Sequence, residues 1–228
     1  MSSIIKQKER GSLVVISGPS GAGKDTVVAK YVRKRKSNAW LSVSCTSRPM
    51  RPGDKEGKSY FFISKEEFEK KIENGDFLEY ALYNGNYYGT PKEHIEEKLQ
   101  SGIDVILVIE VQGALKVKEL IPESICIFIL PPSMKELRQR LVGRKTESKE
   151  KILNRFKTAY QEINEVGKYN YVVTNDEIDT AVSKIQDILM SEKCRVDRIE
   201  ELFLGNEEEE IHELLMDNET FVNEDIKV

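Results

Sequence analysis

The stretch VVISGPSGAGKDTVV, Val14–Val28, joins an apolar run to three glycines and a lysine. Gly18–Lys24 matches the pattern G-x-x-x-x-G-K, with a strand predicted before it and a helix after it, as the pattern requires. Glycine allows backbone angles that let successive N–H groups converge on one phosphate. The helix N-terminus adds positive charge, and Lys24 can reach the terminal phosphates of a nucleoside triphosphate. The stretch therefore predicts phosphate binding, with an ordinary strand-to-helix turn as the alternative.

The residue after the lysine departs from the pattern. The pattern has Ser or Thr there, whose hydroxyl binds Mg²⁺, whereas this chain has Asp25. The next hydroxyl, on Thr26, is turned by about 100° around the helix. We therefore expect Mg²⁺ to be held mainly by substrate phosphates and water, with Asp25 or Thr26 as further candidates. The residues predicted to bind the triphosphate are Gly18, Pro19, Ser20, Gly21, Ala22, Gly23, Lys24, Asp25 and Thr26.

Apolar runs alternate with helical patterns along the chain. The predicted strands are Leu13–Ser17, Trp40–Ser44, Val105–Val111, Ile125–Leu130 and Tyr171–Thr174. Their nearly continuous apolar character is typical of parallel strands that are buried on both faces. Predicted helices, such as Lys24–Lys36, separate most of them. The alternation predicts an α/β fold with a mostly parallel central sheet flanked by helices.

Two regions interrupt this alternation. Tyr60–Tyr88 indicates short strands around a helix, with Asn84 and Gly85 forming a hairpin turn, and is interpreted as a small inserted α+β subdomain. The arginine-rich helical stretch from Ser133 to about Thr158 is interpreted as a mobile flap. Thr90, followed by Pro91 and Glu93, also fits a helix-capping box.

Composition and charge exclude several classes of protein. The chain has 228 residues and a net charge of −4. Residues 196–228 contain 12 acidic and 2 basic side chains, so the rest of the chain is mildly basic. The mildly basic remainder suits an anionic small molecule, and we expect neither a nucleic-acid groove nor a membrane segment. The scattered cysteines, Cys45, Cys126 and Cys194, indicate a reducing compartment, the cytoplasm. The sequence leaves the oligomeric state open.

A second group of residues suggests the phosphate acceptor. Arg48 and Arg51 follow a predicted strand, and arginine binds phosphate through paired, charge-assisted hydrogen bonds. The carboxylate of Glu79 could accept the N1–H and N2–H donors of guanine, while a hydroxyl from Ser44 or Thr90 donates to O6. Adenine would leave the carboxylate unpaired, at a cost of about 1–3 kcal/mol.

These motifs resemble those of guanylate kinases, which are P-loop nucleoside monophosphate kinases. The resemblance covers about residues 11–191 and rests on SGPSGAGKDT, SVSCTSRPMRPGD, LEYALYNGNYYGTP, VIEVQG and LVGRKT. It implies a P-loop fold with a kinase domain at 11–193 and a partly helical or disordered acidic tail at 194–228. Within the domain it implies a core of 11–44 and 92–193, a GMP-binding subdomain at about 45–91 and a helical lid at about 133–158.

The resemblance also implies an activity and its residues. The activity is the transfer of the γ-phosphoryl group of ATP to GMP, and to dGMP, with Mg²⁺. The GMP-binding residues would be Ser44, Arg48, Arg51, Tyr60, Glu79, Tyr88, Thr90 and Glu110. Catalysis would involve Lys24, Arg51, Arg140, Arg144 and Arg155. Asn175 would bind ATP near the adenine.

The chain differs from the family pattern at two further positions, and other functions stay open. Val108 stands where the family commonly has a second acidic residue, and Lys145 where it often has glycine. One alternative is a protein-binding module with a degraded nucleotide site, although Lys24 and the lid arginines favour an enzyme. Another is a related kinase that acts on AMP, UMP or a sugar phosphate.

Overall fold

The computed structural model describes residues 5–7, 10–34, 37–83, 85–142 and 149–202. The chain divides into two compact units, Glu9–Ile188 and a smaller one formed by Met1–Lys8 and Leu189–Val228. In the smaller unit, β1 (Ile5–Gln7) pairs antiparallel with β11 (Ile199–Leu202). The short helix η2 (Val196–Arg198) precedes β11. Most of the predicted acidic tail, from residue 203 onward, lies outside the described residues.

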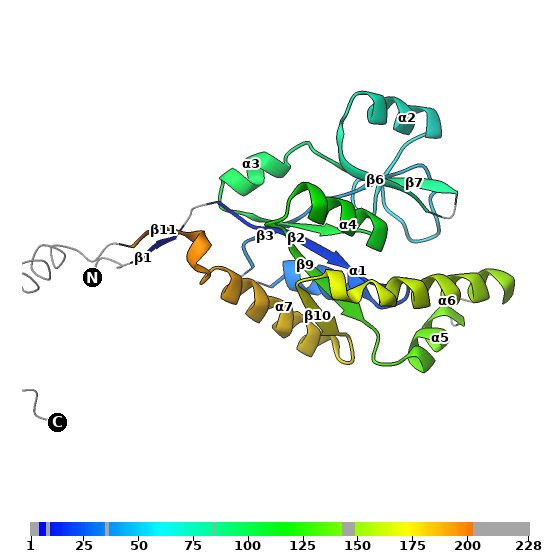
Figure 1. Ribbon diagram of the computed structural model, residues 1–228. Helices are drawn as coiled ribbons and strands as arrows, with labels where there is room; N and C mark the ends of the chain where they lie inside the picture. Colours follow the sequence, from blue (N-terminus) through cyan, green and yellow to red (C-terminus); the bar gives the residue numbers. More distant parts are fainter. Residues whose placement is uncertain (1–4, 8–9, 35–36, 84, 143–148, 203–228) are drawn as a thin grey trace, which may run out of the picture. The chain divides into compact units, whose positions relative to one another are not determined.

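A five-stranded parallel sheet forms the centre of the larger unit (Figure 1). Its strands, in spatial order, are β10 (Tyr171–Thr174), β9 (Ile125–Leu130), β2 (Leu13–Ser17), β8 (Asp104–Val108) and β3 (Ala39–Leu41). The middle strand β2 is buried along its whole length, because parallel strands are covered on both faces. The predicted α/β fold with a mostly parallel sheet is therefore confirmed.

Helices connect the strands and cover the sheet. α1 (Lys24–Val32) leads from β2 to β3, and α4 (Val111–Leu120) leads from β8 to β9 in the opposite direction. Because parallel crossovers are right-handed, the two helices lie on opposite faces of the sheet. Further helices are α3 (Ile95–Gln100), η1 (Val166–Lys168) and α7 (Ile178–Glu192), whose last four residues belong to the smaller unit. Among the described residues, no helix has the length and apolar character needed to cross a membrane.

A four-stranded sheet and one helix form a smaller layer. The strand order is β5 (Phe61–Phe62), β4 (Cys45–Thr46), β7 (Asn86–Pro91) and β6 (Phe77–Tyr83), and α2 (Lys65–Glu73) packs against it (Figure 1). The ring of Phe68 on α2 stacks between Phe77 and Tyr87, with centroid distances of 4.4 and 5.1 Å. This layer has an aromatic core of its own, distinct from the aliphatic core of the central sheet.

Two helices between β9 and β10 occupy the region predicted as a flap. α5 (Met134–Val142) and α6 (Lys149–Asn164) pack together through Leu137, Leu141 and Ala159. The Ser133 hydroxyl accepts the Glu136 N–H at 3.1 Å and so caps α5, as its spacing predicts. Residues 143–148, which include the predicted Arg144 and the unusual Lys145, lie outside the described residues.

Three local predictions are wrong. The strand expected at Trp40–Ser44 ends at Leu41, because the chain then leaves the central sheet and enters the small sheet at Cys45. The strand expected at Val105–Val111 ends at Val108, and Val111 begins α4; an apolar run alone does not separate a buried strand from the helix after it.

The third wrong prediction is the capping box at Thr90. Thr90 and Pro91 belong to β7, and the next helix begins only at Ile95. The Thr90 hydroxyl faces the neighbouring strand instead of a helix end. The predicted hairpin is confirmed, since Tyr83 pairs with Asn86 and Gly85 has a φ of 77°, although Asn84 itself is not described.

Candidate active site

The loop between β2 and α1 contains glycines at positions where a side chain would not fit. Gly18 and Gly23 have φ values of 139° and 89°, which other residues rarely adopt. A Cβ atom on Gly18 would lie 2.2 Å from the Ile129 carbonyl oxygen. Lys24, only 9% exposed, donates from Nζ to the carbonyl oxygens of Gly18 at 2.6 Å and Pro19 at 3.3 Å. The lysine thus lies across the loop, where a bound phosphate could replace the carbonyls as its partner.

Asp25 and Thr26 are exposed in the first turn of α1. Burial raises the pKa of Tyr60, and the charges of Asp25 and Glu110 raise it further. The charges of Asp25 and of Glu110, the residue before α4, therefore both act on the Tyr60 hydroxyl. Among the described residues, no group of three or more His, Cys, Asp and Glu side chains could hold a metal ion.

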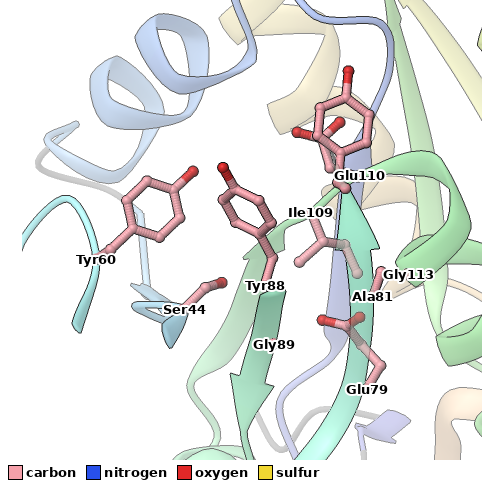
Figure 2. A pocket seen from close by; sticks show the side chains of 10 residues that line it. Ser44, Tyr60, Glu79, Ala81, Tyr88, Gly89, Ile109, Glu110 and Gly113 are labelled. Carbon is pink, nitrogen blue, oxygen red and sulfur yellow. The ribbon is translucent and has the colours of Figure 1, made fainter. Parts of the chain in front are cut away.

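A pocket lies between the small sheet and the N-terminus of α4 (Figure 2). Its lining includes five residues that are predicted to bind the acceptor, Ser44, Tyr60, Glu79, Tyr88 and Glu110, and also Gly113. The Tyr60 and Tyr88 rings meet edge to face with centroids 5.8 Å apart, and Figure 2 shows Ser44 and Glu79 farther along the pocket. The structure therefore brings together five side chains that the sequence predicts to bind the acceptor.

Glu79 is the buried acidic group of this pocket. It is 6% exposed, and the Thr90 hydroxyl donates to its Oε1 at 2.7 Å. Burial raises the pKa of Glu79, while the Thr90 hydrogen bond lowers it. A Cβ atom on Gly113 would lie 2.5 Å from Glu79 Oε2, so the glycine leaves room for the carboxylate. Thr90 orients Glu79, a role in addition to the predicted contact with a base.

Arg48 is fixed at the other side of the pocket. It is 7% exposed, its Nη1 donates to Asp54 Oδ2 at 2.8 Å, and its guanidinium lies 5.3 Å from the centroid of the Tyr60 ring. The Arg51 N–H donates to the same Asp54 oxygen at 2.7 Å, while the Arg51 side chain is exposed. The Arg48 hydrogen bond holds the pKa of Asp54 below its usual range. Sequence reasoning missed Asp54; its position in the turn RPGD, three residues after Arg51, is the signal that could have found it.

Two lid arginines reach the phosphate loop. Arg140 on α5 pairs with Glu136 at 2.7 Å, and its Nη1 approaches the Ala22 carbonyl oxygen at 3.4 Å. Arg155 on α6 donates to the Ser20 hydroxyl at 2.5 Å. Both predicted arginines therefore lie at the site where phosphates would bind.

Asn175 lies directly after β10, on the other side of the loop. It is 5% exposed, and its Nδ2 donates to the Ala22 carbonyl oxygen at 2.8 Å. The residue thus lies at the phosphate loop, and its expected place near the adenine of ATP stays a prediction. Its amide faces the loop backbone.

Glu162 on α6 is a buried acid that sequence reasoning missed. It is 9% exposed, and among the described residues its Oε2 has no hydrogen-bond partner. Burial raises its pKa to about 7, and the charge of Glu110 raises it too, whereas Lys24 and the Ser20 N–H lower it. The signal in the sequence is its spacing of seven from Arg155 and three from buried Ala159, which places it on the inner face of the helix.

Comparison with known proteins gives one family. Residues 10–192 match the family model described as Guanylate kinase. A guanylate kinase of Clostridium tetani is 57% identical over 92% of this chain and all of its own length. One of Caldanaerobacter subterraneus is 55% identical over 90% of this chain and 98% of its own length.

A solved structure agrees with these matches. The crystal structure of guanylate kinase from Anaplasma phagocytophilum has a TM-score of 0.73 and 34% sequence identity, and the match covers 96% of this chain and 99% of that one. The fold, the sequence motifs and the relatives therefore all indicate the same family.

Proposed function

The chain belongs to the guanylate kinase family, and we propose that it transfers the γ-phosphoryl group of ATP to GMP, and also to dGMP, giving ADP and GDP. The observation that carries the proposal is the placement of buried Glu79, with Thr90 bonded to it, in a pocket whose Tyr60 senses the charge of Asp25, the residue after the phosphate loop. This arrangement provides a purine-reading group and a triphosphate cradle within one unit of the chain.

The loop and the lid would bind ATP. On binding, Lys24 exchanges the carbonyls of Gly18 and Pro19 for the β- and γ-phosphates, which are stronger partners because they are charged. Arg155 exchanges the Ser20 hydroxyl for a phosphate oxygen in the same way, and Arg140 stays close to the loop. Arg144, outside the described residues, is proposed to act with them.

The small sheet would bind GMP. Arg48, held by Asp54, contacts its phosphate together with Arg51 and the hydroxyls of Tyr60 and Tyr88. Glu79 accepts the N1–H and N2–H donors of guanine, and Glu110 lies nearby. Because the Thr90 hydroxyl hydrogen is directed to Glu79, Ser44 is the better donor for O6.

Transfer requires alignment and neutralisation of charge more than a base. The second pKa of a phosphate monoester is about 6, so the acceptor oxygen of GMP is ionised near neutral pH. Asp25, Thr26 or Glu110 would help to hold a Mg²⁺ ion through water, and the ion would neutralise part of the charge on the ATP phosphates. Lys24 and the arginines offset the repulsion between the two anions and hold them in line.

The three free thiols support a cytoplasmic location, since two of them, Cys45 and Cys126, are buried without forming a disulfide among the described residues. We propose ATP and GMP as the partners of the chain and leave the oligomeric state open. The acidic tail has no role in this proposal.

A panel of acceptors tests the function. The release of ADP from ATP is measured with GMP, dGMP, AMP, UMP and ribose 5-phosphate at equal concentrations. We expect GMP and dGMP to support turnover at least about 100-fold faster than AMP, because adenine leaves Glu79 unpaired. A preference for another acceptor would assign a different kinase activity, and a folded protein that is inactive with every acceptor would indicate a binding module.

A further inference from the structure

The carbonyl group of Ala22, inside the phosphate loop, is held by side chains from outside the loop. Asn175 Nδ2 donates to this oxygen at 2.8 Å, and Arg140 Nη1 approaches it at 3.4 Å. The main chain of Asn175 is fixed as well, because its N–H donates to the Leu130 carbonyl at 2.8 Å on β9. The amide is therefore anchored to the central sheet and directed at the loop.

The loop is shaped to receive this amide. A Cβ atom on Gly23 would lie 2.4 Å from Asn175 Nδ2, far below a normal contact distance. Gly23 also has a φ of 89°, which a residue with a side chain adopts only with strain. Glycine is therefore required at position 23 for two reasons: the positive φ, and the space that the Asn175 amide occupies.

The planarity of the peptide bond links this contact to phosphate binding. The Ala22 carbonyl and the Gly23 N–H belong to one trans peptide, so the two groups point in opposite directions. With Asn175 on the carbonyl side, the Gly23 N–H is directed away from Asn175. N–H groups of such a loop bind phosphate oxygens, and their direction decides how well they do so.

Resting on the proposed function, we propose that Asn175 is a positioning residue for phosphoryl transfer, which fixes the Ala22–Gly23 peptide so that its N–H faces the triphosphate. The residue then contributes to ATP binding through the loop backbone and not through the adenine ring.

The test compares ATP with inorganic tripolyphosphate, which carries the phosphates but no base. In Asn175→Ala we expect kcat/KM for ATP to fall about tenfold, as for the loss of one buried hydrogen bond. The inhibition constant of magnesium tripolyphosphate, competitive with ATP, should rise by a similar factor, while KM for GMP stays within about twofold.

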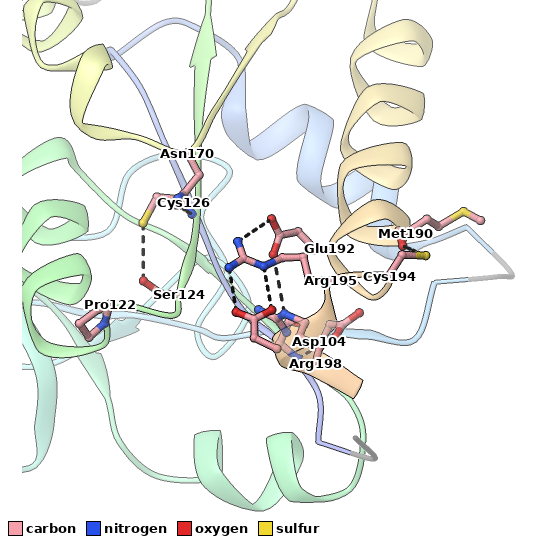
Figure 3. A network of polar contacts seen from close by, with 12 residues as sticks. Asp104, Pro122, Ser124, Cys126, Asn170, Met190, Glu192, Cys194, Arg195 and Arg198 are labelled. Carbon is pink, nitrogen blue, oxygen red and sulfur yellow. Dashed lines mark hydrogen bonds and ion pairs between the residues drawn. The ribbon is translucent and has the colours of Figure 1, made fainter. Parts of the chain in front are cut away.

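A matched control is Asn170→Ala. The Asn170 amide oxygen accepts the Cys126 N–H and the Lys118 ammonium, away from the loop, and Figure 3 shows Asn170 next to Cys126. This variant removes a bonded asparagine from the other end of β10 and should leave both the ATP and the tripolyphosphate constants at their wild-type values. Thermal unfolding of both variants separates loss of folding from loss of binding.

A double variant tests the steric part. Gly23→Ala alone should be severely impaired, because the new methyl group meets the amide. In the Asn175→Ala background that clash is gone, so the added loss from Gly23→Ala should be clearly smaller than in the wild type. Equal losses in both backgrounds would contradict the proposed fit.

Two results would overturn the proposal: an unchanged kcat/KM for ATP in Asn175→Ala, or a raised KM for ATP with an unchanged constant for tripolyphosphate, which would indicate adenine contact. If the wild type failed to phosphorylate GMP, the proposed function would fail separately. Calorimetric binding of tripolyphosphate to wild type and Asn175→Ala would still test the role of Asn175.

Discussion

The phosphate loop and the acceptor pocket belong to the same unit but are built in different ways. The loop is a contiguous run, Gly18–Gly23, that presents its main chain, whereas the pocket is assembled from side chains of separated segments, such as Ser44, Glu79 and Glu110. Main-chain N–H groups bind phosphates, which all nucleoside triphosphates share. Side chains at fixed positions can match one base edge. We therefore expect the loop to bind the phosphate charge and the pocket to select the base.

The largest expected effect lies at the loop. Lys24→Ala removes the cation that spans the loop carbonyls, and we expect kcat to fall by about 10²–10³-fold, because a preorganised charge at the transferring phosphate is lost. GMP binding, measured by calorimetry, should be unchanged. Lys30→Ala on the same helix, where Lys30 pairs with Asp179, is the control. A variant that keeps more than about a tenth of kcat would contradict this division of roles.

The next effect lies in the pocket and concerns selectivity. Glu79→Gln replaces one acceptor oxygen by an NH₂ group that opposes the guanine donors, so kcat/KM for GMP should fall about 100-fold. The rate with AMP should not fall. Glu73→Gln, on the exposed surface of α2, controls for the loss of charge. Equal losses with GMP and AMP would show that Glu79 supports the fold of the pocket and does not read the base.

A third prediction concerns Glu162. Lys24 in the loop lowers the pKa of this residue, and Glu110 in the pocket raises it. Its pKa is raised to about 7 in the folded protein, so its contribution to stability is present below the unfolded value near 4.5 and is lost as the pH rises through 7. Glu162→Gln should therefore raise the free energy of unfolding by about 1–3 kcal/mol at pH 8 and change it little at pH 5. Urea denaturation at both pH values measures this.

The pH dependence is the decisive part of that experiment. Glu119→Gln, at an exposed position of α4, should show little change at either pH. An equal stabilisation by Glu162→Gln at pH 5 and pH 8 would mean that the carboxyl group does not titrate differently in the folded and unfolded protein.

The smallest effect concerns the orientation of Arg48. Asp54→Asn weakens the ion pair that fixes this arginine, and we expect KM for GMP to rise about three- to tenfold with little change in kcat. Asp76→Asn, in the same subdomain, breaks a longer pair with Lys71 and serves as the control. Steady-state kinetics with varied GMP decide between them; equal KM values for both variants would contradict a role of Asp54 in phosphate binding.

The same contrast explains what the sequence could predict. The loop follows from a contiguous pattern, and the strands β2, β9 and β10 have the predicted bounds, because buried parallel strands are nearly continuous apolar runs. The partners of the pocket residues were not predictable. The pairing of Glu79 with Thr90 depends on the register of β6 and β7, which shifts between Phe77 and Glu79.

Glu162 was missed for a related reason. It stands in a helix whose polar residues are mostly exposed, and its spacing from Ala159 becomes a signal only once the burial of that face is known. Asp54 likewise becomes significant only when the turn brings it against Arg48. Local patterns predict elements and main-chain sites, whereas contacts between distant side chains depend on register and packing.

The most direct measurement is a crystal structure with adenosine and guanosine joined by five phosphates in one molecule. It tests whether the loop and the pocket bind their two nucleotides head to head. We expect the guanine within hydrogen-bond distance of Glu79 and the phosphates next to Lys24 and the Gly23 N–H. A guanine bound away from Glu79, or phosphates outside the loop, would contradict the account.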